Sequence, residues 1–205
     1  MPILTRSNSL REISSKDQPG ADLFNYLAGI AEKYEKEEDQ ENQSIFLKKM
    51  LTLFYLDQNQ NHSLLIKCLY RLSVISIDTG DSQSGVEYLK LLTSSSNEIE
   101  QLADAKIIYE AHDKIASIYQ EFGKISYAIY HLEVALFMAK QLFGEYSHQV
   151  VNCHTVLGKL NHSCNNEFLI SAQHFEEALS IGRVLYKNDH KLIADLCIDI
   201  GLQRN

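Results

Sequence analysis

A glycine flanked by two apolar stripes is the feature that most constrains the fold of this chain. In residues 111–136, AHDKIASIYQEFGKISYAIYHLEVAL, apolar residues at helical spacing precede Gly123 and a second such series follows it. Each series predicts a helix with one apolar face. Glycine adopts positive φ without a steric penalty, so Gly123 predicts a tight turn between two antiparallel helices.

The same pair of stripes recurs along the chain. At a shift of 43 residues, Leu72 and Gly80 take the places of Ile115 and Gly123. Further copies of the pattern start at Ile30, Leu157 and Ile200. One helix pair cannot bury its apolar stripe alone, whereas stacked pairs can. A period of 42–43 residues therefore predicts an all-α solenoid of antiparallel helix pairs, with about four pairs and a terminal helix.

The repeats divide the chain into a tail and one domain. Residues 1–20 are polar and contain both prolines, which predicts a disordered tail. Residues 21–205 form the predicted repeat domain. We expect its units near residues 22–58, 61–95, 98–143 and 147–187, followed by a last helix at 190–204. The linker histidines His62, His148 and His190 are interpreted as helix starts.

The repeat pattern resembles the tetratricopeptide repeat, in the longer form found in kinesin light chains and related bacterial proteins. The family has a large apolar, a small and an aromatic residue on its first helix, and small, large and small residues on its second. The residues that match this order are Ile115, Ala116, Tyr119, Ala128, Leu132 and Ala135. The resemblance covers roughly residues 22–205. It implies a right-handed superhelix whose inner groove, lined by the first helices, binds peptides or partner helices.

Two repeats depart from the family pattern. In the first, the second helix around residues 44–55 lacks the small residues that let helices approach closely. In the second, Leu92 stands where the family prefers alanine, and Ser76 replaces the aromatic residue.

Composition argues against several classes of protein. A net charge of −8 disfavours general binding to nucleic acid or to an anionic membrane, which both need basic surface. No apolar run approaches the length of a membrane span, and the N-terminal residues lack the apolar core of a signal peptide. We therefore expect a cytoplasmic protein, in a host cytosol if it is a secreted bacterial effector. Its four cysteines are expected to be reduced and mostly buried.

The candidates for chemistry are weak. Cys153, His154, His162 and Cys164 have the residue types of a zinc site but no common zinc spacing. The segment GDSQSGV, residues 80–86, has the glycine spacing of a phosphate loop but lacks the Lys-Ser/Thr that should follow. We interpret the first set as a buried cysteine with ordinary histidines, and the second as a repeat turn. The sequence predicts no catalytic residue, no metal and no cofactor.

The resemblance instead points to a partner-binding groove. The positions that it implies on the groove include Lys67, Tyr70, Arg71, Val74, Ile77, Lys114, Asn152 and Lys159. One hypothesis is that these cations accept an acidic peptide or helix, with apolar contacts from Tyr70, Val74 and Ile77. The other is that the cations balance neighbouring carboxylates. The sequence leaves both open.

Two functions follow from this interpretation. The first is a non-catalytic module that binds a peptide, helix or protein partner in its groove. The alternative is a regulatory, inhibitory or chaperone-like domain, or a fragment of a longer solenoid, that docks on an enzyme or effector through its helix ends. The apolar segment Leu192–Ile200 motivates the alternative, because one helix cannot hide all of its apolar residues on one side.

Overall fold

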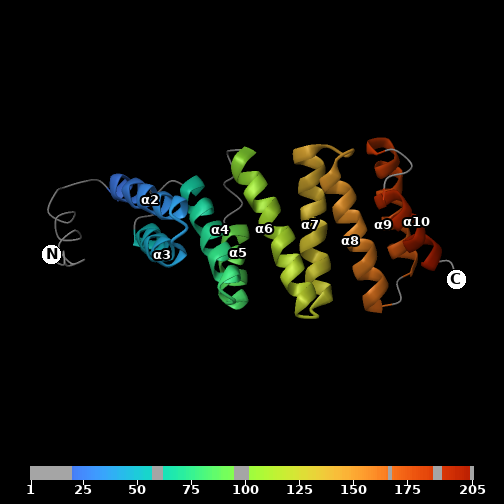
Figure 1. The fold of residues 1–205 in the computed structure, drawn as a ribbon, viewed down its shortest axis with the longest axis horizontal. Coiled ribbons are helices and arrows are strands. Elements are labelled where there is room, and N and C mark those ends of the chain that lie inside the picture. The colour runs from blue at the N-terminus through green and yellow to red at the C-terminus, as the bar shows by residue number, and fades with distance from the viewer. Residues whose placement is uncertain (1–19, 57–61, 95–101, 166–167, 187–190, 204–205) are drawn as a thin grey trace.

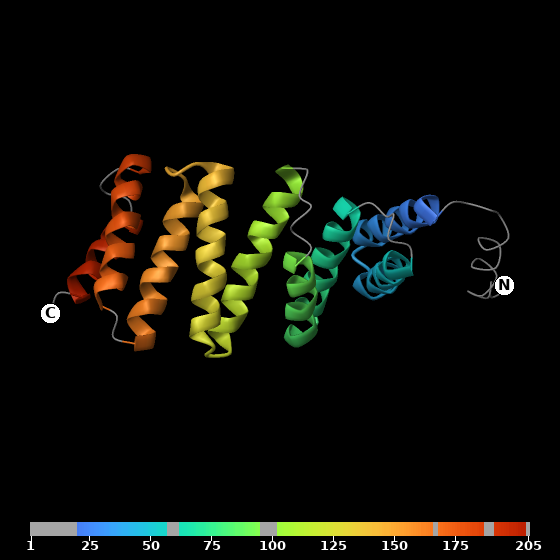
Figure 2. The same ribbon diagram turned by 180° about the vertical axis from the view of Figure 1, so that it is seen from behind.

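The fold is a row of stacked helix pairs. The computed structural model describes residues 20–56, 62–94, 102–165, 168–186 and 191–203. Each element in these ranges is an α-helix: α2 (Gly20–Lys36), α3 (Gln40–Leu56), α4 (His62–Asp78), α5 (Ser82–Ser94), α6 (Leu102–Glu121), α7 (Ile125–Phe143), α8 (His148–Asn165), α9 (Phe168–Leu185) and α10 (Lys191–Gln203). They follow one another in chain order along the long axis (Figure 1), and the view from behind shows the same row (Figure 2). The prediction of an all-α solenoid is confirmed; the predicted tail lies outside the described residues except for Gly20.

Two of the three predicted helix starts are found at the expected residues. His62 and His148 begin α4 and α8, as predicted, whereas His190 lies outside the described residues. Within the described ranges, no helix has both the length and the apolarity that crossing a bilayer requires.

Positive-φ glycines close the turns inside the pairs. Gly80 and Gly123 have φ of 87° and 67°. After each glycine, the next N–H donates to the carbonyl five residues earlier, from Asp81 to Ser76 and from Lys124 to Tyr119, both at 2.8 Å. This is the Schellman pattern, which satisfies the last carbonyls of a helix. Gly123 is therefore the turn between two helices that the sequence predicts.

The first pair makes the same turn without glycine. Glu38 has φ of 57°, and the N–H of Asp39 donates to the carbonyl of Tyr34 at 3.0 Å. Glu38 lies 42 residues before Gly80, so it holds the glycine position of its repeat. A residue with a Cβ is strained in this conformation.

Small residues meet where the two helices of a pair cross. In the second pair, a Cβ added to Gly85 would lie 2.6 Å from Cγ1 of Ile77 and 3.2 Å from the carbonyl oxygen of Ser73. In the fourth pair, Ser171 Oγ donates to the carbonyl oxygen of Gly158 at 2.7 Å. The third pair buries Ala116 and Ala128 at the same repeat positions, whereas the first buries Ala31 and Gln43. The first pair is thus the only described pair with a long side chain at this crossing.

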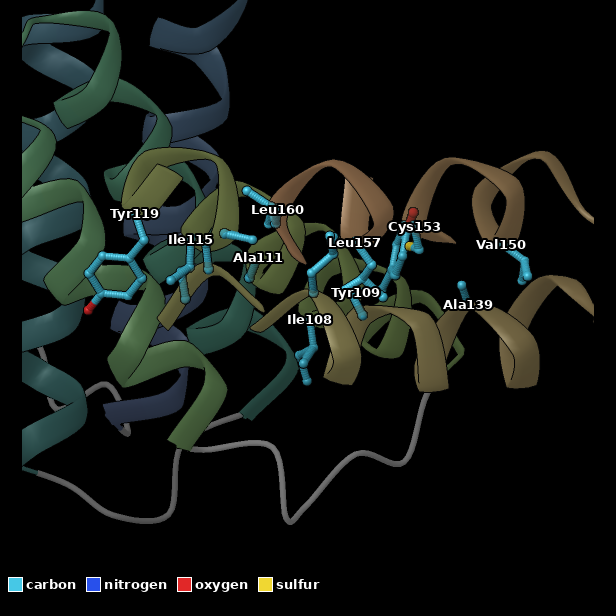
Figure 3. Close-up of a cluster of buried hydrophobic side chains, with 14 of the residues drawn as sticks. Ile108, Tyr109, Ala111, Ile115, Tyr119, Ala139, Val150, Cys153, Leu157 and Leu160 are labelled. Carbon is cyan, nitrogen blue, oxygen red and sulfur yellow. The ribbon is translucent and has the colours of Figure 1, made fainter. Parts of the chain in front are cut away.

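The core consists of two clusters. The larger extends from α4 to α10 and includes Ile115, Leu132 and Leu157; part of it is drawn in Figure 3. The smaller joins α2, α3 and α4 through Phe24, Leu27, Ala31, Leu47, Met50, Cys68, Leu72 and Ile75. The first pair and one side of α4 therefore form a core that is separate from the larger cluster.

The last described helix covers most of its apolar residues. Ile193, Leu196 and Ile200 of α10 are buried. A Cβ on Gly182 of α9 would lie 3.0 Å from Cδ1 of Ile193, which shows how closely α10 approaches α9. Ile198 is 61% exposed. One large apolar side chain, and not a whole apolar face, is therefore left open on the described part of α10.

Two histidine pairs, one buried and one partly buried, link the helices of the third and fourth pairs. The Nδ1 atoms are 3.0 Å apart in His112–His131 and also in His154–His174. Burial, together with the partner imidazole, lowers the pKa of His112 and of His154 to about 4. One neutral ring of each pair donates and the other accepts.

These pairs predict loss of stability in acid. Between pH 6.5 and 4 the unfolded chain binds more protons than the folded one, so the free energy of unfolding should fall as pH falls through this window. At pH 5 each pair should contribute about 1 kcal/mol to this fall after solvent screening. Urea unfolding at pH 7 and pH 5 measures it. The variant His112→Leu/His131→Tyr, which installs the residues of the second pair, Leu69 and Tyr88, should show a smaller difference. An unchanged difference would contradict the assignment.

The strained turn predicts a stabilising substitution. Glu38→Gly should raise the free energy of unfolding by about 1 kcal/mol, because glycine adopts this φ without strain. Chemical denaturation with circular dichroism detects the change. Gly123→Ala, the reverse change in the third pair, should lower stability by a similar amount; a stabilising effect there would overturn the argument.

Candidate functional site

A cavity of about 340 Å³ lies at the N-terminal end of the row. Its walls come from α2, α3 and α4, with one residue from α6. We call it the α2–α4 cavity; it is lined by Ala28, Ala31, Glu32, Glu35, Gln43, Leu47, Met50, Leu64, Lys67, Cys68, Tyr70, Arg71 and Ile107. Three of the predicted groove residues, Lys67, Tyr70 and Arg71, therefore lie side by side on one cavity.

The floor of the α2–α4 cavity is apolar, and its position follows from the sequence of α3. Leu47 and Met50 are buried beneath it. Gln43 and Met50 occupy the repeat positions that the third pair fills with Ala128 and Ala135. Longer side chains at these positions occupy space that small residues leave free for the close approach of two helices. The departure from the repeat pattern thus coincides with the cavity.

The rim of the cavity is charged on both sides. Arg71 of α4 forms an ion pair with Glu35 of α2. The hydroxyl of Tyr70 donates to Oε2 of Glu110 on α6 at 2.7 Å. Burial and this hydrogen bond raise the pKa of Tyr70, so the hydroxyl keeps its proton. Lys67 is exposed and has no ion-pair partner among the described residues.

The cavity thiol is unsuited to nucleophilic chemistry. Cys68 is buried, and its Sγ donates to the carbonyl oxygen of Leu47 at 3.2 Å. Burial raises the pKa of Cys68 to about 12. Because the thiolate is the reactive form, this side chain is inert at neutral pH.

Two further cavities lie along the row. One of about 360 Å³ shares Glu35, Gln43 and Arg71 with the α2–α4 cavity and adds Val74. Another, of about 190 Å³, lies between α6 and α8 and is lined in part by Asn152. It also contains Asp113, whose pKa is raised, chiefly by burial.

The remaining predicted groove residues lie outside these cavities. Ile77 packs on the core beside Gly85. Lys114 is half-buried and Lys159 is exposed. The structure therefore brings together the predicted residues of α4 other than Ile77, and separates them from Lys114, Asn152 and Lys159.

Sequence reasoning missed the contribution of α2 to the site. The groove positions that the resemblance implies lie five, two and one residues before the first apolar residue of a repeat, and two and five residues after it, as Lys67 and Tyr70 do around Leu72. Around Ile30 these positions are Asn25, Ala28, Gly29, Glu32 and Glu35. Three of the five, Ala28, Glu32 and Glu35, line the α2–α4 cavity. The repeat pattern does not predict that α3 residues line the cavity, because they do so where α3 departs from that pattern.

The weak zinc candidates serve other contacts. Cys153 is buried, with its pKa raised to about 12 by burial. His154 pairs with His174, and the ring of His162 lies 5.5 Å from that of Phe168. The side chain of Cys164 lies outside the described part of the chain. Among the described side chains, no three ligand residues are grouped as a metal site needs.

Comparison with known proteins supports the fold. No protein-family model and no curated protein sequence matches the chain. The crystal structure of BtubC (BKLC) from P. vanneervenii is similar, with 20% identity and a TM-score of 0.63, over 90% of this chain and 72% of that one. A putative kinesin light chain from Podosopora anserina with nearly identical TPR-like repeats has 11% identity and a TM-score of 0.64, over 91% and 87%.

MamA from Desulfovibrio magneticus is also similar, with 13% identity and a TM-score of 0.56, over 92% of this chain and 97% of that one. At these identities the likeness concerns the fold alone. The chain has a TPR-like fold, as the sequence pattern predicts.

Thiol burial predicts selective labelling. Cys197 is exposed, whereas Cys68 and Cys153 are buried. At pH 7 an aromatic disulfide reagent should modify Cys197 rapidly, and Cys68 and Cys153 only after unfolding. Peptide mapping by mass spectrometry assigns each site. Modification of Cys68 at the rate of Cys197 in the folded chain would contradict its burial.

Proposed function

We propose that this chain is a non-catalytic interaction module that binds a peptide or helix of a partner protein at the α2–α4 cavity. The observation that carries the proposal is the cavity itself, with an apolar floor beneath a charged rim. Its volume of about 340 Å³ falls in the range of about 300–1,000 Å³ typical of ligand pockets. The resemblance of the sequence to the tetratricopeptide repeat, together with the TPR-like repeats of a structurally similar protein, also favours a module that binds a protein partner.

An apolar side chain of the partner is the natural occupant of the floor. Leu47, Met50 and Leu64 offer a wall without hydrogen-bonding groups, so an aliphatic or aromatic side chain would lose water on both sides. Tyr70 can add contact area at the rim, as aromatic residues commonly do in interfaces.

Lys67 gives the proposal its electrostatic part. Arg71 already has Glu35 as its partner, which supports the balancing interpretation for this arginine. Lys67 is the rim cation without an ion pair among the described residues. We therefore propose that the partner contributes one carboxylate, which lies next to Lys67. A generally acidic ligand would be repelled by Glu32 and Glu35 on the same rim.

Docking through the helix ends receives less support. The described apolar residues of α10 are largely covered by α9, with Ile198 as the large exposed exception. The cavity, in contrast, brings apolar and charged groups together.

Two variants test the cavity. Ala28→Phe should fill the α2–α4 cavity, and Lys67→Glu should repel the partner carboxylate, each lowering retention of cavity partners at least about tenfold. Cross-linking affinity capture with quantitative mass spectrometry compares both with the wild-type chain. Arg71 stays unchanged, because its substitution would also break the ion pair with Glu35.

Lys159→Glu is the matched control. It makes the same charge change at an exposed position that lines none of the three cavities. Proteins retained by the wild-type chain and this control, but lost from both cavity variants, would support the proposal. Equal retention by all four chains, with matching circular dichroism, would refute it.

A further inference from the structure

The outward side of α7 carries an exposed apolar row. Tyr127, Tyr130 and Phe137 are 61%, 59% and 67% exposed. Val134, between them in sequence, is half-buried. With 100° between successive residues, the four fall within an arc of about 80° on the helix. We call Tyr127, Tyr130, Val134 and Phe137 the α7 stripe.

The solenoid does not require this stripe. At the repeat positions of Tyr127, Tyr130 and Phe137, the equivalent helix α5 has Ser84, Glu87 and Ser94. Helix α9 also has polar residues at two of the three positions, Gln173 and Ser180.

The opposite side of α7 already forms the core contacts, through Ala128, Leu132, Ala135 and Ala139. The ring of Tyr127 lies 5.4 Å from that of Tyr119 on α6, a contact within the third pair. Packing between repeats does not explain why all three aromatic residues of the stripe are exposed. Large exposed apolar groups gathered on one face are typical of interaction sites.

The spacing of the stripe indicates the shape of its occupant. The steps between its residues are three, four and three, which is the spacing of the apolar positions in a helix that packs lengthwise on another helix. Ten residues of helix cover about 15 Å, or about three turns of a partner helix. A row of this form fits the apolar face of an amphipathic helix.

Charge beside the stripe selects between a second copy and a different protein. Glu133 is exposed on one edge of the stripe. If two copies paired antiparallel along α7, their two-fold axis would bring Glu133 close to its own copy, and like charges at such positions are destabilising. Lys140 follows on the same edge of the stripe, but it is half-buried, and its charge lowers the pKa of His154 on α8.

We propose that the α7 stripe binds an amphipathic helix of a different protein, which places an apolar row on Tyr127, Tyr130, Val134 and Phe137 and a basic residue beside Glu133. This site is separate from the proposed cavity site. None of the stripe residues lines any of the three cavities described above. One chain could therefore hold two partner segments at once.

A defined peptide tests the stripe without knowledge of the natural partner. The probe is a synthetic, fluorescein-labelled peptide of about 18 residues with leucine at heptad positions a and d and lysine at e and g. Its binding is followed by fluorescence anisotropy. The variant Tyr127→Ser/Tyr130→Glu/Phe137→Ser, which installs the residues of α5, should weaken binding at least about tenfold. All three positions are exposed, so the variant should fold as the wild-type chain does.

Charge reversal tests the proposed contact between Glu133 and a basic residue of the partner. A second peptide with glutamate at e and g should bind the wild-type chain more weakly than the lysine peptide, and Glu133→Lys should reverse this order. Lys67→Glu, in the α2–α4 cavity, should leave the affinity of the lysine peptide unchanged. Success of this control separates the stripe from the cavity.

Three outcomes would overturn the proposal. The first is equal affinity of the lysine peptide for the wild-type chain and the triple variant, at matched circular dichroism. The second is absence of saturable binding at peptide concentrations up to about 1 mM. The third is a wild-type dimer in sedimentation velocity that becomes monomeric in the triple variant, which would assign the stripe to a second copy of this chain.

Discussion

The close approach of two helices at one crossing position underlies the rest of this structure. Gly85 leaves no room for a Cβ beside Ile77, and a Cβ on Gly158 would lie 2.7 Å from the ring of Phe175. Ser171 donates to the carbonyl oxygen of Gly158 at the same crossing. Where the crossing is tight, the large residues on either side fill the space between helices and form a continuous core. Where the small residue is replaced by Gln43, in the first pair, a cavity lies beside the crossing. The regular and the irregular parts of the molecule therefore depend on the size of one side chain per repeat.

The sequence predicted the elements that repeat and missed those that depend on exceptions. Gly80 and Gly123 allow their turns to be predicted, because glycine is the residue that adopts positive φ most readily. Glu38 makes the same turn and gives no such signal, since its conformation is imposed by the helices on both sides. His112 and His131 are 19 residues apart, and their pairing becomes visible only when α6 and α7 lie together. Its recurrence 42–43 residues later as His154 and His174 was a usable sign.

The residues of α4 at the candidate site could be predicted from the sequence, whereas their partners on other helices could not. Lys67, Tyr70 and Arg71 follow from helix periodicity, which fixes the side of α4 on which they lie. The partners that decide their behaviour, Glu35 for Arg71 and Glu110 for Tyr70, come from neighbouring helices. Periodicity within one helix carries no information on these contacts. The electrostatic character of the rim therefore needed the structure.

The separate core of the first pair has a consequence for dynamics. Its cluster around Phe24 and Leu47 meets the larger cluster through the half-buried Leu51, Phe54 and Tyr88. In repeat proteins each unit is held mainly by its neighbours, and within the described residues the first pair packs on one neighbouring pair, through α4. We expect α2 and α3 to open as one cooperative unit, so their amides should exchange through a partial opening that leaves α6 to α9 folded. A segment bound in the α2–α4 cavity would oppose that opening, so exchange should slow throughout α2 and α3, including at amides that the segment does not touch.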